Sequence, residues 1–540
     1  MTKRRCNNNL TGMHKGASDS NIRELRTAHR YLRAACSTAF PVFLAVAAIF
    51  LAFYGSSACF FQDESYVVWL AEPGLHHIAQ YIQYEPHPPL YHTILTFWIA
   101  LAGDSERSVR ALSGIFYLLA LVTIARMGRS LFRRGELILI LVLVACCPVL
   151  LQAAVYGRMF TLTFFESCVA FLAFYSVFLK RTAGAGTAVL LAVTNLAGML
   201  THYYFAFVMA AEAIVFFVFV RRNWLTAGFA LVLPGILFLA LWGPRLLAQL
   251  RTDRFAGSLA GPFPSVGLEI YGYYGKRWIF VLLSLSILFF VSLSGRHFGW
   301  RRWPAVEANL LSAIRDRRLQ AFAIIWATTF VGPFLAAAVV GTAFWKGGMT
   351  YLPTMLPLAV VLALFVRRGA LTLQVVLAFL ILSITVAAQI RSRNINEALN
   401  TDTRESIQLL KDKASDGDIV IGLDNYITLF YYYMGRAPRA RHLAVLAYPP
   451  ELANHPGWYN ERLTLKDRDA YVAATRAYAA ELRRELAAHP GRRLWLIDTS
   501  WNPKTTRIVT GVFDSTLRRV ESIIVTGGTG YTEYIAYEAP

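Results

Sequence analysis

The sequence predicts an α-helical polytopic membrane protein that carries a C-terminal α/β domain, and three observations support this fold class. Of the 540 residues, 56% are hydrophobic and only 16% are charged, a balance too apolar for an ordinary soluble domain. Apolar runs long enough to cross roughly 30 Å of hydrocarbon recur from Ala39 to Ile390. After Arg391, charged and turn-forming residues alternate with short helix-like and strand-like stretches.

The lysines and arginines predict the orientation in the membrane. They lie in short clusters between apolar runs, which is how the cytoplasmic side of a membrane protein is marked. The formal charge of +20 therefore reflects topology, and we expect no nucleic-acid partner. With the basic N-terminal segment inside, the first span delivers Asp63-Glu64 to the outer face. The clusters used are 1–38, 126–134, 180–181, 221–222, 296–318 and 367–368.

The apolar segment 90–102 decides the number of spans. If it crossed the membrane, the later basic clusters would alternate to the wrong side, and it is also too short to span. We therefore predict an interfacial or re-entrant helix there, and a chain with about eleven spans that ends outside. The predicted spans are 39–57, 109–126, 137–155, 160–179, 187–201, 205–220, 225–243, 278–294, 321–342, 351–366 and 370–390.

These boundaries predict three parts. Residues 1–38 form a basic cytoplasmic segment, and 39–390 form the transmembrane domain, whose first outer loop (58–108) carries juxtamembrane helices. Residues 391–540 form an extracytoplasmic α/β domain. In that domain we expect helices at 404–413 and 467–488, and strands at 418–423, 494–497, 522–526 and 534–537.

The C-terminal domain has no recognisable catalytic motif. It lacks a P-loop, a dinucleotide fingerprint and a nucleophile elbow. The glycine-rich run 527–530 is predicted to be a hairpin turn, because no helix-like stretch follows it. The six cysteines show no metal-binding spacing and lie no further along than Cys168, so a disulfide framework is not expected.

Polar residues gather on the predicted outer face. This topology brings together groups that are far apart in the sequence, although it was drawn from charge alone. The groups are Asp63-Glu64, the segment 85–89, Tyr156-Gly157-Arg158, the segment 201–204, the segment 345–351 and a looser aromatic and basic loop at 251–278. Arg158 and Lys346 are exceptions to the positive-inside rule, so this convergence indicates a functional site.

Each group also has a structural interpretation. Asp63-Glu64 could cap an amphipathic helix at 65–81, and His87-Pro88-Pro89 could simply separate two helices. The aromatic residues fit an interfacial belt, and His202 could be a neutral member of it. Arg158 and Lys346 could extend to lipid headgroups. No single motif decides between these interpretations.

The order of the motifs is more specific than any one of them. The acidic pair is followed by His87-Pro88-Pro89-Leu90-Tyr91, then by 103–106, 110–113 and the basic turn 129–134. Arg158-Met159, His202-Tyr203-Tyr204 and the proline-containing run from Tyr351 to Pro357 continue the series. This order resembles the polytopic GT-C glycosyltransferases, in the protein mannosyltransferase-like group that includes aminoarabinose and lipopolysaccharide-core sugar transferases. The resemblance covers residues 39–366.

The resemblance implies an inverting glycosyltransferase in a bacterial inner membrane. It would move a sugar from a polyprenyl-phosphate donor to a lipid, glycan or protein acceptor on the outer side. Asp63 is expected to be the catalytic base and Glu64 its supporting acid. The residues expected to bind substrate are His87, Tyr91, Arg158, His202, Tyr203, Lys346 and Tyr351.

Two features qualify this assignment. Many relatives carry a basic residue directly before the tyrosine at position 351, where this chain has Thr350, so Lys346 would have to supply the charge for the donor phosphate. No cofactor is expected, and a divalent metal ion stays open because the acidic pair has few further oxygen ligands nearby.

Two competing functions stay open. A transporter or flippase of lipid-linked sugars would need ionisable groups within the spans, where only Glu166 and Glu212 stand out. An O-antigen ligase-like enzyme would share the lipid substrate without sharing this order of motifs. An assay with labelled polyprenyl-phosphate sugars separates the three possibilities.

Overall fold

The computed structural model describes most of the chain after the first span. By its internal contacts the chain divides into two units, Met1–Tyr54 and Gly55–Pro540, and the first lies outside the described residues, as do the predicted spans 278–294 and 370–390, the loop 252–278 and Lys346. The described residues are 59–251, 316–340, 348–366, 404, 407–423, 427–434, 443–450, 464–499, 503–527 and 530–540.

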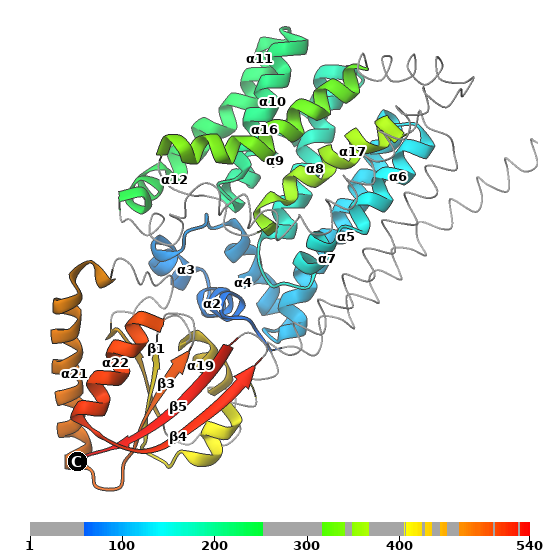
Figure 1. Cartoon of the computed structure of the whole chain (residues 1–540). Coiled ribbons are helices and arrows are strands. Elements are labelled where there is room, and N and C mark those ends of the chain that lie inside the picture. The colour runs from blue at the N-terminus through cyan, green and yellow to red at the C-terminus, as the bar shows by residue number, and fades with distance from the viewer. Residues whose placement is uncertain are drawn as a thin grey trace, which may run out of the picture. The chain divides into compact units, whose positions relative to one another are not determined.

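The first half of the second unit is helical (Figure 1). Its first loop holds α2 (Gln62–Ala71), α3 (Leu75–Tyr81), the 3₁₀ turn η1 (Ile82–Tyr84) and α4 (Leu90–Ala102). The helices that follow are α5 (Glu106–Leu131), α6 (Arg134–Ala145), α7 (Pro148–Ala154), α8 (Phe160–Phe174) with η2 (Tyr175–Lys180), α9 (Ala185–Thr201), α10 (Phe205–Val215) with η3 (Phe216–Val220), α11 (Trp224–Ala227) with η4 (Gly228–Val232), α12 (Leu233–Arg251), α16 (Arg317–Val340), η6 (Gly348–Thr354) and α17 (Met355–Val366).

Most described helices coincide with predicted spans. Within the described residues, three helical stretches are long and apolar enough to cross a membrane: Glu106–Leu131, Phe160–Lys180 and Trp224–Gln249. Shorter apolar helices, such as α9, lie at other predicted spans. The chain is thus a mostly helical membrane protein, whereas the total of eleven spans stays a prediction.

Two helix predictions were wrong in detail, and proline explains both. The expected span 137–155 is two helices, because Pro148 lacks an amide hydrogen and disfavours helical backbone at Cys147. The expected helix 65–81 is also two helices, α2 and α3. They separate at Pro73-Gly74, where Gly74 adopts a φ of 105°.

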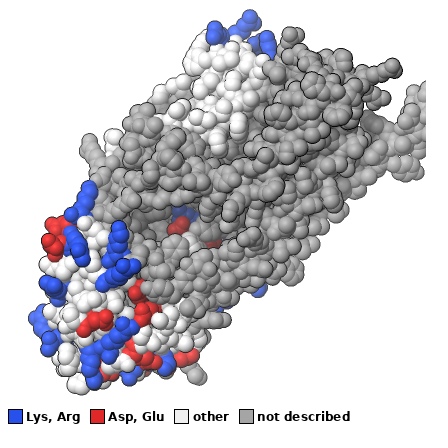
Figure 2. Space-filling view, viewed as in Figure 1, with Lys and Arg blue, Asp and Glu red and all other residues white. Residues whose placement is uncertain are grey.

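The helices bring polar groups to one end and basic turns to the other. The helix α8 begins beside Arg158 and continues as η2 to Lys180, whose ammonium donates to the carbonyl of Ser130 in the basic last turn of α5. The next helices return to His202 and run out again to Arg221. In Figure 2 the described helical surface is largely uncharged, apart from basic side chains at the tip where α11 begins. The described groups of the expected convergence therefore lie at one end of the helices, whereas the loop 251–278 and Lys346 stay untested.

The second half of this unit forms a five-stranded sheet with the order β2-β1-β3-β5-β4. The strands are β1 (Ile419–Leu423), β2 (Ala444–Tyr448), β3 (Leu494–Thr499), β4 (Arg518–Gly527) and β5 (Gly530–Glu538). The strand β1 pairs in parallel with β2 and with β3, whereas β5 pairs antiparallel with β3 and with β4. Gly527 pairs with Gly530, so β4 and β5 form the predicted hairpin.

Helices cover both faces of the sheet (Figure 1). The helices α21 (Arg468–Ala488) and α22 (Pro503–Thr516) share one hydrophobic core with residues such as Ile421 and Leu496. On the other face, α19 (Ile427–Met434) packs over Val420 and Trp495, in a core that continues into α2 and α4. The sequence analysis missed β2, α19 and α22. The three-part division at 39 and 391 and the outer location of the sheet stay predictions.

Candidate active site

Both carboxylate oxygens of Glu64 accept hydrogen bonds from the protein. Its Oε1 accepts hydrogen bonds from Arg110 Nε at 2.9 Å and from the Gly157 amide at 2.7 Å. Its Oε2 accepts from Arg110 Nη2 at 2.7 Å and from the Phe61 amide at 2.9 Å. The last bond closes the first turn of α2, so the capping interpretation of the acidic pair is correct for Glu64. The Glu64 side chain is 1% exposed, and donors of the protein already occupy both of its oxygens, so it is poorly placed to accept a proton from a substrate.

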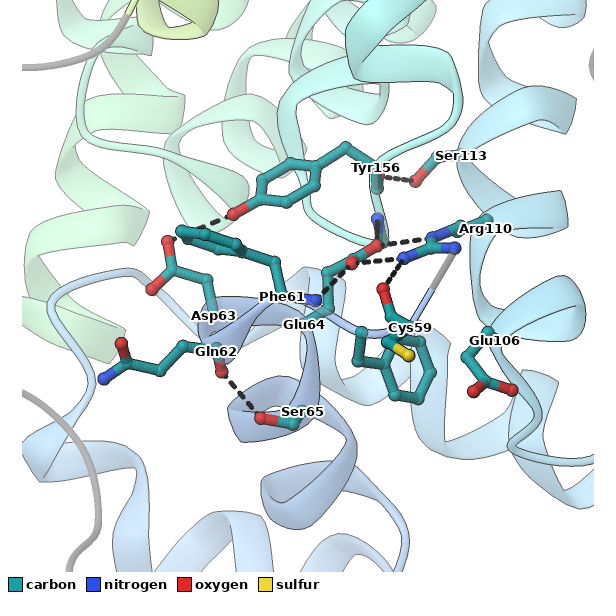
Figure 3. Close-up of polar contacts among 12 residues, drawn as sticks. Cys59, Phe61, Gln62, Asp63, Glu64, Ser65, Glu106, Arg110, Ser113 and Tyr156 are labelled. Atoms are coloured by element: carbon teal, nitrogen blue, oxygen red, sulfur yellow. Dashed lines mark hydrogen bonds and ion pairs between the residues drawn. The ribbon is translucent and has the colours of Figure 1, made fainter. Parts of the chain in front are cut away.

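Asp63 has the opposite environment. Consecutive residues of a helix point about 100° apart, so the two carboxylates leave α2 in different directions (Figure 3). Asp63 is partly exposed, and its Oδ2 accepts a hydrogen bond of 3.2 Å from the hydroxyl of Tyr156. Burial, together with the nearby Asp63 carboxylate, raises the pKa of Tyr156, which therefore stays a donor. Asp63 is the carboxylate of the pair that a substrate can reach.

Arg158 lies next to Asp63 and is buried but weakly bonded. Its Nη1 donates to the Asp63 carbonyl oxygen at 3.3 Å, and its Nη2 lies 3.8 Å from Glu85 Oε1. Its Nε has no hydrogen-bond partner among the described residues, although the side chain is only 2% exposed. Burial lowers the pKa of Arg158, but the Asp63 and Glu85 carboxylates outweigh this, so the guanidinium remains charged. A buried cation with so few partners is suited to an anionic ligand.

Glu85 and two histidines complete this cluster. Glu85 Oε1 lies 2.6 Å from His87 Nδ1 and 3.8 Å from His92 Nε2. Burial raises the pKa of Glu85, although the charges of Arg158 and His92 oppose the shift. Burial also lowers the pKa of His87, with Arg158 acting in the same direction. The imidazole of His87 is therefore neutral at pH 7.

His202 and Tyr203 reach the same region from the turn between α9 and α10. The rings of His87 and His202 are 4.9 Å apart, and Nδ1 of His202 accepts the amide hydrogen of Tyr204 at 3.1 Å. The hydroxyl of Tyr203 donates to Gln249 Oε1 at 2.5 Å, and Gln249 in turn donates to the Glu85 carbonyl at 2.6 Å. These bonds tie the ends of α9, α10 and α12 to the segment that precedes α4.

The remaining predicted residues, Tyr91, Tyr351 and Lys346, differ in their relation to this cluster. Tyr91 is buried, and burial raises the pKa of its hydroxyl; its ring contacts that of His92, so it lies beside the cluster. The ring contacts of Tyr351 are instead with Tyr204 and Phe330, in the packing among α10, α16 and η6. Lys346 lies outside the described residues.

Sequence reasoning left several residues of the site without a role. Arg110, Glu85 and His92 were absent from the candidates, and so was Tyr156, although it stood beside Arg158 in a noted segment. The available signal was charge in apolar surroundings: Arg110 lies at the start of a predicted span, where an ionisable side chain needs a partner. The identity of that partner, Glu64, is 46 positions away and could not be inferred from spacing.

The described part of the chain offers no group of three or more His, Cys, Asp or Glu side chains arranged to hold a metal ion. Glu64 is fully occupied by donors, and Glu85 already faces two imidazoles and a guanidinium. A divalent ion, which the sequence left open, stays open.

The buried histidines predict a pH dependence of stability. Burial lowers the pKa of His92 from 6.5 to about 4. The unfolded state therefore binds more protons between these values, and the folding free energy that neutral His92 contributes is lost as the pH falls from about 6.5 to about 4. Glu85, whose pKa is raised, acts in the opposite sense. We expect His92→Gln to flatten the decline of the thermal unfolding midpoint below pH 6.5, measured from pH 7.5 to 4.5.

The control for this measurement is His76→Gln, because His76 is an exposed histidine on the neighbouring helix α3. It should retain the wild-type dependence on pH. Equal slopes for all three proteins would show that His92 does not titrate with unfolding.

The fold and the site together define a helical membrane protein with a partly exposed carboxylate beside a buried arginine at one end of its helices. A family model described as Dolichyl-phosphate-mannose-protein mannosyltransferase matches residues 86–247. No curated protein matches the chain by sequence.

A protein solved in two states shares the fold. ArnT from Cupriavidus metallidurans in the apo state has a TM-score of 0.55 and 12% identity over 93% of this chain and 98% of that chain. The same protein bound to undecaprenyl phosphate has a TM-score of 0.54 and 12% identity over 92% and 98%. An Archaeoglobus fulgidus oligosaccharyltransferase is less similar, with a TM-score of 0.46 and 15% identity over 92% and 72%. The predicted resemblance to the GT-C glycosyltransferases is therefore confirmed in the family model and the fold.

Proposed function

We propose that this protein is an inverting glycosyltransferase that moves a hexosyl or pentosyl group from a polyprenyl-phosphate donor to a lipid, glycan or protein acceptor. One observation carries the proposal: Asp63, a partly exposed residue, lies beside the buried Arg158, which donates to the Asp63 backbone carbonyl and whose Nε has no hydrogen-bond partner among the described residues. The described part of the chain thus supplies a base for the acceptor and a cation for the departing phosphate. The matching family model and the solved structure with bound undecaprenyl phosphate support this substrate class.

The reaction is a single displacement at the anomeric carbon. Asp63 takes the proton of the acceptor hydroxyl as its oxygen attacks C1 from the face opposite the phosphate. The C1–O bond to the phosphate breaks, and its electron pair stays on the phosphate. Because phosphate is a good leaving group, it needs stabilisation of charge rather than a proton. Arg158 provides that charge, and the neutral His87 and His202 can donate or accept hydrogen bonds at the same place.

Glu64 acts on Asp63 indirectly in this mechanism. Its ion pair with Arg110 holds α2 against α5, and its bond with the Gly157 amide holds the turn that carries Tyr156 and Arg158. We therefore interpret the supporting acid as a positioning residue that sets the distance between the base and the cation.

The location of the reaction follows from the same proposal. The basic turns lie at the opposite end of the helices from Asp63, and by the positive-inside rule this supports a site on the outer face of the membrane. We propose that the N-terminus is cytoplasmic, that the sheet domain is extracytoplasmic, and that the membrane is the inner membrane of a bacterium.

The direct test is an assay of the purified protein with a panel of labelled polyprenyl-phosphate sugars in vesicles. Transfer of label to an acceptor would support the proposal. Movement of labelled lipid across the bilayer without transfer would instead indicate a flippase. Glu166 and Glu212, the ionisable residues that would suit a transport path, are bonded to Thr201 and Asn195 of a neighbouring helix.

The role of Arg158 gives a second measurement. Arg158→Ala removes the cation next to Asp63, so we expect the KM for the lipid donor to rise about tenfold or more while the KM for the acceptor changes little. Arg158→Lys should restore part of the affinity, since the lysine ammonium keeps the positive charge but cannot form the bidentate hydrogen bonds of a guanidinium. An unchanged KM for the donor in Arg158→Ala would remove this residue from the phosphate site.

A further inference from the structure

The sheet domain contributes a helix that contacts the Asp63-bearing turn on both sides. Phe60, three residues before Asp63, donates its amide hydrogen to the hydroxyl of Tyr433 in α19 at 2.7 Å. Ser65, two residues after Asp63, lies 2.8 Å from the hydroxyl of Thr428 in the same helix. These four residues belong to segments more than 360 positions apart in the sequence.

The hydroxyl of Tyr433 joins three elements. It accepts from the Phe60 amide and donates to Glu106 Oε1 at 2.9 Å, so its single hydrogen and one lone pair are both used. Glu106 is the first residue of α5, the helix that also carries Arg110. Arg404 reinforces this contact, because its Nη2 donates to Glu106 at 2.6 Å and its guanidinium lies 5.8 Å from the centroid of the Tyr433 ring.

The second bond is buried at both ends. The Ser65 hydroxyl also donates to the Gln62 carbonyl at 2.8 Å, and in its bond with Thr428 either hydroxyl could be the donor. Thr428 is fully buried and Ser65 is 1% exposed, so bulk water does not replace this contact. Losing the bond to Tyr433 would take a hydrogen-bond partner from the amide of the buried residue Phe60, and losing the bond to Thr428 would remove the second tie between α19 and α2.

We propose that Tyr433 and Thr428 are positioning residues for Asp63, and that the sheet domain is therefore required to hold the turn that carries this carboxylate. Within the helical part, α2 is held by the ion pair between Glu64 and Arg110. The helix α19 adds one fixed point on each side of Asp63, which sets the carboxylate relative to Arg158. This inference rests on the proposed transferase function.

The test compares Tyr433→Phe and Thr428→Val with Tyr431→Phe. The first two keep the shape of the side chain and remove only the hydrogen-bonding group. The control removes a hydroxyl from the same helix at a residue that packs against the shared core. We expect kcat to fall about tenfold or more in the first two, because misplaced reacting groups slow the chemical step. The KM for the lipid donor should stay within about twofold of the wild-type value, since Arg158 is unchanged.

Hydrogen exchange supplies a readout that does not depend on activity. Amide exchange in peptides covering residues 59–66 should become faster in Tyr433→Phe and Thr428→Val, and should not change in Tyr431→Phe. Faster exchange with an unaltered kcat would overturn the positioning role while leaving the transferase proposal intact. Unchanged exchange would show that α19 does not hold this turn. A wild-type protein that transfers no sugar would overturn the proposed function, and the exchange comparison would still decide whether α19 holds the turn.

Discussion

Asp63→Asn is expected to abolish sugar transfer while leaving the protein folded. Asparagine has the size of aspartate and keeps an oxygen that can accept the Tyr156 hydrogen bond, so the local packing should survive. It cannot take a proton from the acceptor hydroxyl at neutral pH, and loss of a positioned base typically costs about 10²–10⁴-fold in rate. Because α2 is held through Glu64, Ser65 and Phe60, the substitution removes none of the bonds that fix the helix.

The measurement is the rate of transfer from a labelled polyprenyl-phosphate sugar, together with binding of the lipid donor and the thermal unfolding midpoint. Donor binding and the midpoint should match the wild type. Glu72→Gln is the matched control, since it neutralises an exposed carboxylate at the other end of the same helix. An Asp63→Asn variant with near-normal turnover would exclude Asp63 as the base.

Arg110→Met is expected to have the largest effect on stability. The substitution leaves the Glu64 carboxylate 1% exposed and without its bidentate partner. Breaking a buried ion pair by removing one member typically costs about 3–5 kcal/mol, because an uncompensated charge stays in a medium that solvates it poorly. We therefore expect a markedly lower thermal unfolding midpoint and little folded protein at physiological temperature.

Two further variants separate this effect from general damage. Arg518→Met breaks an ion pair with Glu538 on the surface of the sheet domain, where Arg518 is 63% exposed, so the midpoint should barely move. Adding Glu64→Gln to Arg110→Met removes the stranded charge while keeping an oxygen for the Gly157 amide, and should recover part of the loss. Equal midpoints for Arg110→Met and the wild type would mean that this pair does not hold α2 to α5.

The outline of the transmembrane part could be predicted because it depends on local properties. Apolar runs of sufficient length form helices in hydrocarbon, where every backbone amide must find a partner within its own segment. The predicted spans at α5, α8, α9 and α10 therefore agree with the structure. The failures occurred where proline interrupted an apolar run, as at Pro148, and in the C-terminal domain, where α19 packs in a core shared with α2 and where α22 was missed.

The site was predicted only as a set of neighbours. Charge clusters and chain reversal were sufficient to bring Asp63, His87, Arg158 and His202 to one end of the helices. The sequence alone could not distinguish the roles of the two adjacent carboxylates. In sequence Asp63 and Glu64 are alternatives, and the family resemblance ranked them by analogy.

What the sequence by itself determined is a polytopic membrane chain whose polar groups meet at one end, because hydropathy and positive charge act on each segment separately. Only the tertiary structure distinguishes the environments of the two carboxylates. Glu64 meets Arg110 and the Gly157 amide, which come from distant parts of the chain, and those bonds occupy both of its oxygens. The Asp63 side chain points the other way, toward the hydroxyl of Tyr156, and stays partly exposed, because neighbouring side chains diverge around a helix axis.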